Sequence, residues 1–378
     1  MSAPEQFALR LLVPAFALAL IGLIAVHAIW RVLAIIDASV VAGRRSARRP
    51  GAGRALVVLL LSAITIGAHG AAGLWIQSYS TAGEVIFRPS PDGGDPPTVP
   101  LPEEGPINVL FIGVDWMPGR DHGLTDSLIL ASFQRESDRL SMISVPRDTG
   151  RVPFYLGGTY NARINSLVGS ARRDPERFPD GPIGTLTNEI GYIVGVPVHY
   201  FMLVNMAGFA EAVDMVGGID FRLENDIRDD HHKFYLEAGR HHLNGRQALM
   251  VARSRFGPND NDWQRARRQQ QLLRALMSKA KDPAVLIRAP QLVEKLGEVT
   301  RTNAPVDQLP QLLDLLARAN DSSTDHYVLS PNKFASRIPP AEVGGRYMTQ
   351  LRMDKVAELS IELFGQYSRY HPGASGQP

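Results

Sequence analysis

A chain of 378 residues with 44% hydrophobic and 21% charged residues is long enough to bury a large core, and its composition is not that of a disordered protein. Its formal net charge of +2 is too small for the basic surface that nucleic-acid binding requires, so we expect no nucleic-acid partner. Cysteine is absent, so no disulfide supports the fold and the chain must be stable through its own core.

Two apolar runs near the amino terminus, residues 11–30 and 55–76, contain no acidic residue, lysine or arginine. Each is long enough for a helix that crosses a hydrocarbon core of about 30 Å. The loop between them, RRSARRPGAGR, is placed in the cytoplasm by the positive-inside rule. Residues 1–80 are therefore predicted to be a two-span, multi-pass anchor in the cell membrane. A cleaved signal peptide is the alternative for the first run, but that run is long and a second span follows closely.

The rest of the chain is predicted to lie outside the cytoplasm. Residues 81–106 include RPSPDGGDPPTVPLPEEGP, in which proline and glycine disfavour both helix and sheet, and we expect a semi-extended linker. Residues 107–365 are predicted to form one catalytic domain, and residues 366–378 a flexible tail.

Within that domain, β-rich runs alternate with helical patterns, which is typical of an α/β fold with helices on a central sheet. Six polar residues, QRESDR, join the second and third β-rich runs, a length that suits an antiparallel hairpin. We therefore predict a mixed central β-sheet flanked by helices. The expected strands are 107–113, 127–133, 140–145, 198–204 and 325–329, and the expected helices are 164–172, 183–194, 206–216, 244–253, 262–281, 284–298, 307–318 and 353–365.

Ionisable residues stand at the ends of the first three predicted strands. Asp115 follows the first, Asp126 begins the second, and Arg147 and Asp148 follow the third. Two carboxylates are the usual protein contribution to a Mg²⁺ site, and a guanidinium suits bidentate phosphate binding. Each Asp alone is more often a turn or cap residue. Asp148 is predicted to orient another group, because adjacent residues rarely face each other.

A second group of cations follows further along the chain. Arg253 and Arg255 point the same way if extended, and Arg265, Arg268 and Gln269 share one face of a predicted helix. Such a face suits phosphate or sugar oxygens, although a merely solvated arginine face is the ordinary alternative. Arg163, in the weaker motif RINS, is a further candidate cation. Asn165 of the same motif could supply an amide to the site, but it could equally be only the N-cap of the helix that follows.

Other chemistries lack their usual signatures. The two HH pairs, at 231–232 and 241–242, do not have the spacing of a zinc site. No G-x-S-x-G motif, Walker loop or cysteine is present, which disfavours acyl transfer and nucleotide hydrolysis.

Taken together, eight blocks resemble the LytR-CpsA-Psr (LCP) family of cell-wall enzymes. Their order and spacing match the family over residues 107–281, and such a series is specific where any one block is not. The blocks are NVLFIGVD, LTDSLILASF, MISVPRDT, RINS, FMLVNMAGF, VDMVGGIDF, LNGRQALMVARSRF and RARRQQQLL.

The resemblance implies a phosphotransferase that moves a glycopolymer from a polyprenyl-pyrophosphate carrier to peptidoglycan through a phosphodiester, assisted by Mg²⁺ or Mn²⁺. It also assigns roles to the residues above. Asp115 and Asp126 would hold the metal, with Asp126 our first choice of general base and Asp148 an orienting residue. Catalysis would depend on Asp126, Arg147 and Arg255, and the pyrophosphate would be bound by Arg147, Arg163, Arg253, Arg255, Arg265, Arg268 and Gln269.

Two positions depart from the family pattern. The family commonly has Arg where this chain has Leu124, and Lys where it has Arg163, so a phosphate-binding cation is missing unless Arg120 or Arg163 replaces it. The carrier's lipid also needs an apolar channel, for which the helices at 183–194, 206–216 and 353–365 are candidates. Two alternatives remain: a polyprenyl-pyrophosphate phosphatase, in which water replaces the sugar hydroxyl, and a non-catalytic envelope regulator that binds lipid-linked glycan.

Overall fold

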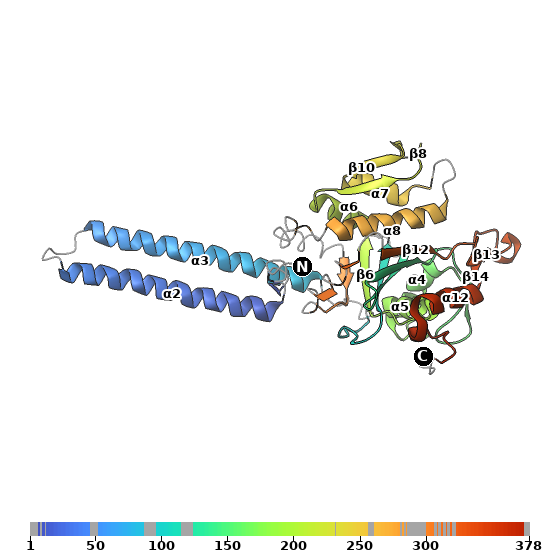
Figure 1. Cartoon of the computed structure of the whole chain (residues 1–378), viewed down its shortest axis with the longest axis horizontal. Coiled ribbons are helices and arrows are strands. Elements are labelled where there is room, and N and C mark those ends of the chain that lie inside the picture. The colour runs from blue at the N-terminus through green and yellow to red at the C-terminus, as the bar shows by residue number, and fades with distance from the viewer. Residues whose placement is uncertain are drawn as a thin grey trace.

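Two long helices, α2 (Pro14–Arg45) and α3 (Ala52–Ile86), lie side by side and project from an α/β domain (Figure 1). The computed structural model describes residues 7, 10–11, 13–45, 52–86, 96–114, 124–230, 232–255, 261–279, 282, 285, 300–305, 308, 311–312, 315, 318–319 and 323–373.

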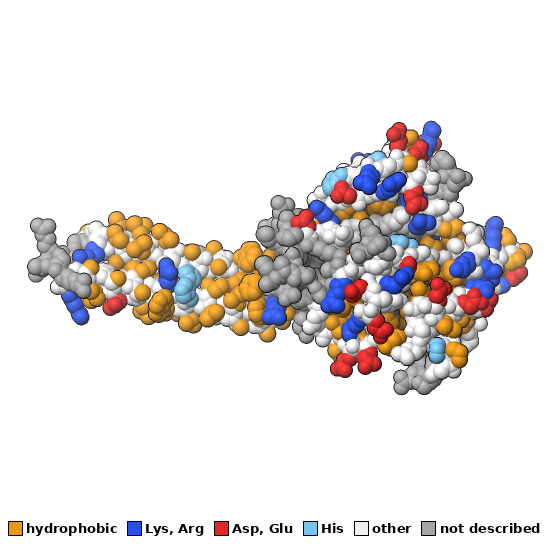
Figure 2. Space-filling view, viewed as in Figure 1, with side chains coloured by type: hydrophobic (Ala, Val, Ile, Leu, Met, Phe, Trp, Pro, Cys, Tyr) orange, Lys and Arg blue, Asp and Glu red, His pale blue; other side chains and the backbone are white. Residues whose placement is uncertain are grey.

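Both helices are long and apolar enough to cross a membrane, which indicates that they anchor the domain to one. Hydrophobic side chains cover much of the visible surface of the hairpin (Figure 2). Between the helices, His27 Nδ1 and His69 Nε2 are 2.9 Å apart. Both helices extend beyond the predicted spans. Because α3 continues to Ile86, the first residues of the predicted linker, 81–106, are helical.

A six-stranded mixed sheet forms the centre of the α/β domain, as predicted. The strand order is β11-β6-β1-β2-β3-β12. The β1–β2, β2–β3 and β6–β11 pairs are antiparallel, whereas β1–β6 and β3–β12 are parallel. The QRESDR segment does join an antiparallel hairpin. The bounds are β1 Ile107–Val114, β2 Thr125–Gln134, β3 Arg139–Ser144, β6 Tyr200–Asn205, β11 Thr300–Thr302 and β12 Thr324–Val328.

Helices cover both faces of this sheet, which explains why β2 and β3 are buried on both sides. On one face lie η1 (Ile164–Ser166), α4 (Leu167–Arg173), α5 (Gly181–Val194) and α12 (Met353–Phe364). Helix α5 buries Ile183, Leu186, Ile190 and Ile193, an apolar stripe with helical spacing. On the other face, Leu273 and Met277 of α8 (Asp262–Lys279) pack against β2 and β3.

A separate layer packs on the far side of α8, above it in Figure 1. Its own core joins α6 and α7 to an antiparallel β7–β10 ladder and to Leu272 of α8. Gly217 and Gly218 follow α6 in the left-handed region, with φ of 82° and 88°, and β7 begins directly after them. The bounds are α6 Met206–Met215, β7 Ile219–Leu223, β8 Ile227–Asp229, β9 Phe234–Leu236, β10 Gly239–Leu243 and α7 Gly245–Arg253.

This layer affects the predicted lipid channel. Helices α5 and α12 belong to the main core, whereas α6 belongs to the core beyond α8. That these three helices line one channel stays a prediction. The predicted helices 284–298 and 307–318 lie largely outside the described residues.

The carboxyl-terminal part folds back onto the main core. It contributes β13 (Ala335–Arg337), η4 (Pro340–Val343), β14 (Thr349–Leu351), α12 and η5 (Gly365–Tyr367), and two short strands, β4 (Val152–Pro153) and β5 (Thr159–Tyr160), lie near it. The prediction of a flexible tail from residue 366 is wrong as far as Tyr370. Ser368 is buried, and the Tyr370 hydroxyl donates to the carbonyls of Tyr192 and Ile193 at 3.1 and 2.9 Å.

Glu189 of α5 provides a test of this core. The side chain is fully buried, and burial raises its pKa to about 7, although the Tyr155 N–H donates to it at 3.1 Å. The folded state therefore holds this proton more tightly than the unfolded chain, and stability falls as pH rises from 4.5 to about 7. Glu189→Gln keeps an acceptor oxygen and removes this titration. We expect it to raise the free energy of unfolding by about 3 kcal/mol near pH 8 and hardly at all near pH 4.

Denaturant unfolding of the detergent-solubilised chain at both pH values measures this difference. Glu358→Gln is the control, because Glu358 is exposed and pairs with Lys355 at 2.6 Å. An equal effect of Glu189→Gln at both pH values would contradict the assignment.

Candidate active site

A narrow cleft lies where the start of β2, the end of β3 and the first turns of α8 meet. Because β2 and β3 are antiparallel, the beginning of one and the end of the other share an edge of the sheet. This arrangement brings together residues predicted from two distant parts of the sequence. The lining residues are Asp126, Ser127, Leu128, Ser144, Val145, Pro146, Arg147, Asp148, Asp262, Trp263, Arg265, Ala266 and Gln269.

Arg147 is held between two carboxylates. Its Nη1 donates to Asp126 Oδ1, and its Nε lies 3.7 Å from Asp148 Oδ2, too far for a hydrogen bond. The Nε–H group is buried and has no hydrogen-bond acceptor among the described residues. An orphaned donor of this kind is uncommon in folded proteins, and an oxygen of a bound anion would satisfy it.

Asp148 contacts a second cation. It is 7% exposed, and its Oδ1 accepts a hydrogen bond from Arg163 Nη1 at 2.8 Å. The backbone supports the pair, because Asn165 N–H donates to the Arg147 carbonyl at 3.2 Å. Asp148 thus contacts Arg163 as well as its neighbour Arg147, and its orienting role stays a prediction. Asn165 itself makes no side-chain cap.

Arg265 approaches the cleft from α8. It is 6% exposed, its Nη2 is 3.2 Å from Asp262 Oδ1, and its Nε–H is buried without a hydrogen-bond acceptor in the described chain. Burial lowers its pKa to about 10, with Arg255 and Arg147 acting in the same direction and Asp262 and Asp126 opposing. Arg265 therefore stays charged at neutral pH. Arg265 and Arg147 both line the cleft.

Arg253 and Arg255 flank this cleft from the end of α7. Both are exposed, and Arg255 Nε lies 3.4 Å from Asp262 Oδ1, so Asp262 bridges Arg255 and Arg265. Neither Arg253 nor Arg255 is among the lining residues of the cleft. Asp115 and Arg120 lie outside the described residues, so the structure does not place them.

Arg268 does not point its guanidinium at the cleft. Its Nε donates to the Val251 carbonyl at 3.2 Å and its Nη2 to the Ser254 carbonyl at 2.6 Å. Gln269 lines the cleft, but its amide also donates to the Ala252 carbonyl at 3.1 Å. Both side chains therefore satisfy carbonyls at the carboxyl end of α7, which otherwise lack partners. These two bonds engage two of the five N–H donors of Arg268, and its predicted phosphate contact stays a prediction.

This role of Arg268 gives a stability prediction. Arg268→Ala removes charge-assisted hydrogen bonds to partly buried carbonyls, so we expect the free energy of unfolding to fall by about 2 kcal/mol. Arg267→Ala is the matched control: Arg267 is exposed and lies 3.5 Å from Glu224, so its loss should cost less than about 0.5 kcal/mol. Equal unfolding midpoints for the two variants would show that Arg268 does not hold α7.

Carboxylate oxygens are the ligands that a hard divalent cation takes from proteins. Three carboxylates, of Asp126, Asp148 and Asp262, line the cleft. The described hydrogen bond of Asp126 is the one from Arg147, which uses one of its two carboxylate oxygens. Among the residues the structure describes, no three His, Cys, Asp or Glu side chains are arranged to hold a metal. A Mg²⁺ or Mn²⁺ ion bound at Asp126 would therefore take most of its ligands from phosphate oxygens and water, as Mg²⁺ commonly does.

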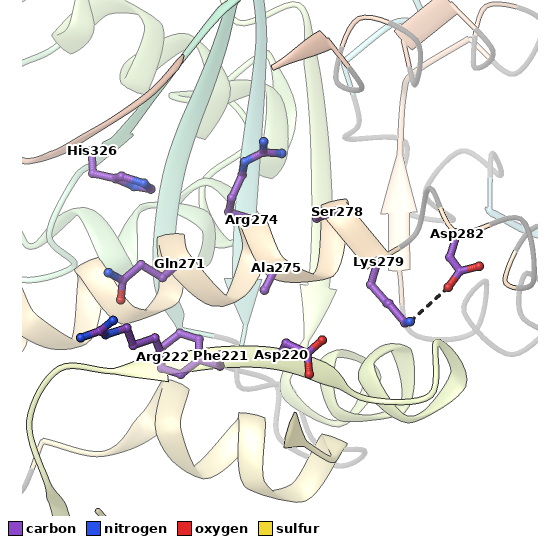
Figure 3. Close-up of a pocket in the computed structure, with 10 residues that line it drawn as sticks. All are labelled: Asp220, Phe221, Arg222, Gln271, Arg274, Ala275, Ser278, Lys279, Asp282 and His326. Carbon is purple, nitrogen blue, oxygen red and sulfur yellow. Dashed lines mark hydrogen bonds and ion pairs between the residues drawn. The ribbon is translucent and has the colours of Figure 1, made fainter. Parts of the chain in front are cut away.

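A larger cavity, of about 590 Å³, lies elsewhere, between β7, α8 and His326 of β12 (Figure 3). None of the predicted site residues lines it. Its two carboxylates already have partners, since Asp282 lies 3.1 Å from Lys279 and Asp220 2.8 Å from His242. Arg222 at its edge is exposed, and this makes it a useful control for the arginines of the cleft.

Sequence reasoning missed two contributors to the cleft. Trp263 lines it from the first turn of α8, and the β13–β14 hairpin supports the Asp148 backbone through a 3.0 Å hydrogen bond from Thr349 N–H. Trp263 could have been predicted, because it adjoins Asp262 in the arginine-rich segment. The hairpin could not, because it reaches the cleft through hydrogen bonds between residues about 200 positions apart in the sequence.

Comparison with known proteins supports the assignment of the blocks. The model of the LytR_cpsA_psr family matches residues 85–358. An uncharacterised Staphylococcus aureus protein is 30% identical over 222 residues, 56% of this chain and 51% of that protein. A Bacillus cereus protein named polyisoprenyl-teichoic acid–peptidoglycan teichoic acid transferase TagU is 28% identical over 213 residues, 56% of this chain and 64% of its own length.

The chain thus spans less than two thirds of either relative. The fold matches the crystal structure of B. subtilis TagV with a TM-score of 0.55 and 22% identity, covering 69% of this chain and 97% of that one. Since the family model covers more than half of the sequence, this chain belongs to the LytR_cpsA_psr family.

Proposed function

We propose that this protein is a membrane-anchored phosphotransferase that moves a glycopolymer from a polyprenyl-pyrophosphate carrier to peptidoglycan through a phosphodiester bond. The observation that carries the proposal is the convergence of Arg147 and Arg265 on one cleft, each with a buried Nε–H that lacks an acceptor. The B. cereus relative, named a polyisoprenyl-teichoic acid–peptidoglycan teichoic acid transferase, supports the choice of substrate class.

The reaction requires positioning and charge neutralisation more than covalent chemistry from the protein. The oxygen of an acceptor hydroxyl bonds to the phosphorus next to the glycan, and the bond from that phosphorus to the bridging oxygen breaks. Polyprenyl phosphate leaves with the electron pair. Arg147 and Arg265 bind the phosphate oxygens, with Arg163 and Arg255 at the edge of the cleft, and Asp126 accepts the proton of the hydroxyl through its oxygen that is not bonded to Arg147.

A divalent cation, Mg²⁺ or Mn²⁺, held at Asp126 would neutralise charge that develops on the pyrophosphate oxygens. Arg163 is our candidate to replace the cation that the family commonly has at position 124. Its contact with Asp148, the carboxylate that Arg147 also faces, supports this role.

The arginine-rich loop supports a topology in which the α2–α3 connection is cytoplasmic and the α/β domain is extracytoplasmic. The domain would then stand on the side of the membrane where peptidoglycan is found. Fusion of a reporter that is active only outside the cytoplasm to residue 378 tests this topology, and an inactive reporter in a correctly inserted chain would contradict it.

Transfer is tested with the full chain in detergent or bilayers. Radiolabelled lipid-linked glycan, Mg²⁺ and peptidoglycan are supplied, and the wall polymer is assayed for covalently bound label. Release of phosphate without labelled wall would favour the phosphatase alternative. Binding of the lipid without any turnover, together with full function of Asp126→Ala in cells, would favour the regulator.

A further inference from the structure

The β13–β14 hairpin is tied to the loop that carries Arg147 and Asp148. Thr349 N–H donates to the Asp148 carbonyl at 3.0 Å, and Gly150 N–H donates to the Thr349 carbonyl at 2.8 Å. Arg151 Nη1 donates to Glu342 Oε2 at 2.6 Å in the connection between the strands. The hairpin is therefore part of the site's framework.

The packing between the two segments is tight. A Cβ atom on Gly150 would lie 2.6 Å from Met348 Sδ and 2.8 Å from the Ala162 carbonyl, so only glycine fits there. Met348 directly follows Tyr347. Tyr347 thus lies between Glu342, which pairs with Arg151, and Met348 and Thr349, which contact Gly150 and Asp148. These contacts fix its backbone relative to the Asp148 loop.

Tyr347 lies two residues before Thr349, whose N–H donates to the Asp148 carbonyl. It is 37% exposed, and the Arg337 guanidinium lies 5.1 Å from the centre of its ring, which holds the ring in place. Burial, and then the charges of Asp262 and Asp148, raise the pKa of its hydroxyl, with Arg337 acting against them. Both of these carboxylates line the cleft.

A second aromatic ring comes from α8. Trp263, in the first turn of α8, lines the cleft between Asp262 and Arg265 in sequence. Large exposed apolar side chains are few in the described α/β domain: Leu124, Leu156, Tyr235 and Tyr347. Leu124 immediately precedes β2, whose second residue, Asp126, lines the cleft.

We propose that Tyr347, fixed by Arg337, and Trp263 form a subsite for the pyranose ring that adjoins the phosphate group. Aromatic faces pack on the apolar face of a sugar ring, while a guanidinium offers several donors to its hydroxyls. The subsite rests on the proposed function, which places a phosphate on Arg147 and Arg265. The sugar next to that phosphate then lies where the hairpin and α8 meet the cleft.

Binding to the full chain tests the subsite without turnover. Affinities for a pyranose 1-phosphate and for inorganic phosphate are compared by calorimetry. Wild type should prefer the sugar phosphate by about tenfold, a usual contribution of one stacking ring. Tyr347→Ala should lose this preference and Tyr347→Phe should keep it, while Arg147→Ala should weaken both ligands. Tyr235→Ala is the control, because Tyr235 is 56% exposed on β9, away from the cleft.

Kinetics then test whether this sugar belongs to the donor. Tyr347→Ala should raise KM for the lipid-linked donor with little change in kcat, whereas a rise in KM for peptidoglycan alone would overturn the assignment. Trp263→Ala should act in the same direction as Tyr347→Ala. A Tyr347→Ala chain that keeps its preference for the sugar phosphate, with KM values like those of Tyr235→Ala, would overturn the subsite. A wild-type chain with the preference but no transfer would instead refute the proposed function.

Discussion

Arg147→Ala should lower kcat for glycan transfer by about 10³-fold, the largest effect we expect from any single substitution. The side chain does two things that alanine cannot do. It supplies a fixed guanidinium to the phosphate, and it neutralises Asp126 and Asp148, both of which line the cleft. Without it the two carboxylates would repel the pyrophosphate that must bind between them. Initial rates with lipid-linked glycan and peptidoglycan measure the loss.

Arg222→Ala is the control for lost positive charge, since Arg222 is an exposed arginine at the larger cavity. It should retain activity within about twofold. Arg147→Lys should lie between wild type and Arg147→Ala, because an ammonium keeps the charge but not the planar pair of donors. A loss smaller than tenfold in Arg147→Ala would show that Arg147 is not in contact with the reacting phosphate.

Asp148→Ala should lower kcat/KM by about 10²-fold, although Asp148 is not expected to touch the substrate. It is 7% exposed and anchors Arg163 at 2.8 Å while facing Arg147. Its removal leaves Arg163 without that partner and frees both guanidiniums to move. We expect the free energy of unfolding to fall by about 2 kcal/mol as well, because a partly buried ion pair loses one member.

A double-mutant cycle with Arg163→Ala separates these effects. If Asp148 acts by holding Arg163, the second substitution should add little to the first, and the coupling energy should exceed about 1 kcal/mol. Asp230→Ala provides the comparison, since Asp230 and Arg228 form an exposed pair at 3.2 Å. Additive losses in the Asp148/Arg163 cycle would mean that the two residues act independently.

The sequence was sufficient for five of the six strands of the sheet and for much of the cleft, but β11 was not expected. The β-rich runs that follow Asp126 and precede Arg147 are apolar enough to be strands, and a short polar connection makes them antiparallel neighbours. That pairing alone brings Asp126 and Arg147 to one edge. The helical spacing of Arg265 and Gln269 likewise put them on one face, and both line the cleft.

Side-chain partners could not be predicted in the same way. Arg268 shares the face of Arg265, but whether its guanidinium meets a phosphate or a carbonyl depends on where α7 ends in space. Residue spacing carries no such information. The layer formed by α6, α7 and β7–β10, and the packing of Tyr370 on α5, likewise depend on contacts between residues far apart in sequence.

The most direct test of the account is transfer carried out in H₂¹⁸O. The full chain is given lipid-linked glycan, Mg²⁺ and peptidoglycan, and the phosphate groups of both products are examined by mass spectrometry. If the acceptor hydroxyl attacks the phosphorus next to the glycan, the new phosphodiester and the released polyprenyl phosphate both lack ¹⁸O. A glycan phosphate that carries one ¹⁸O atom, with no label reaching the wall, would show that water is the nucleophile and would contradict transfer.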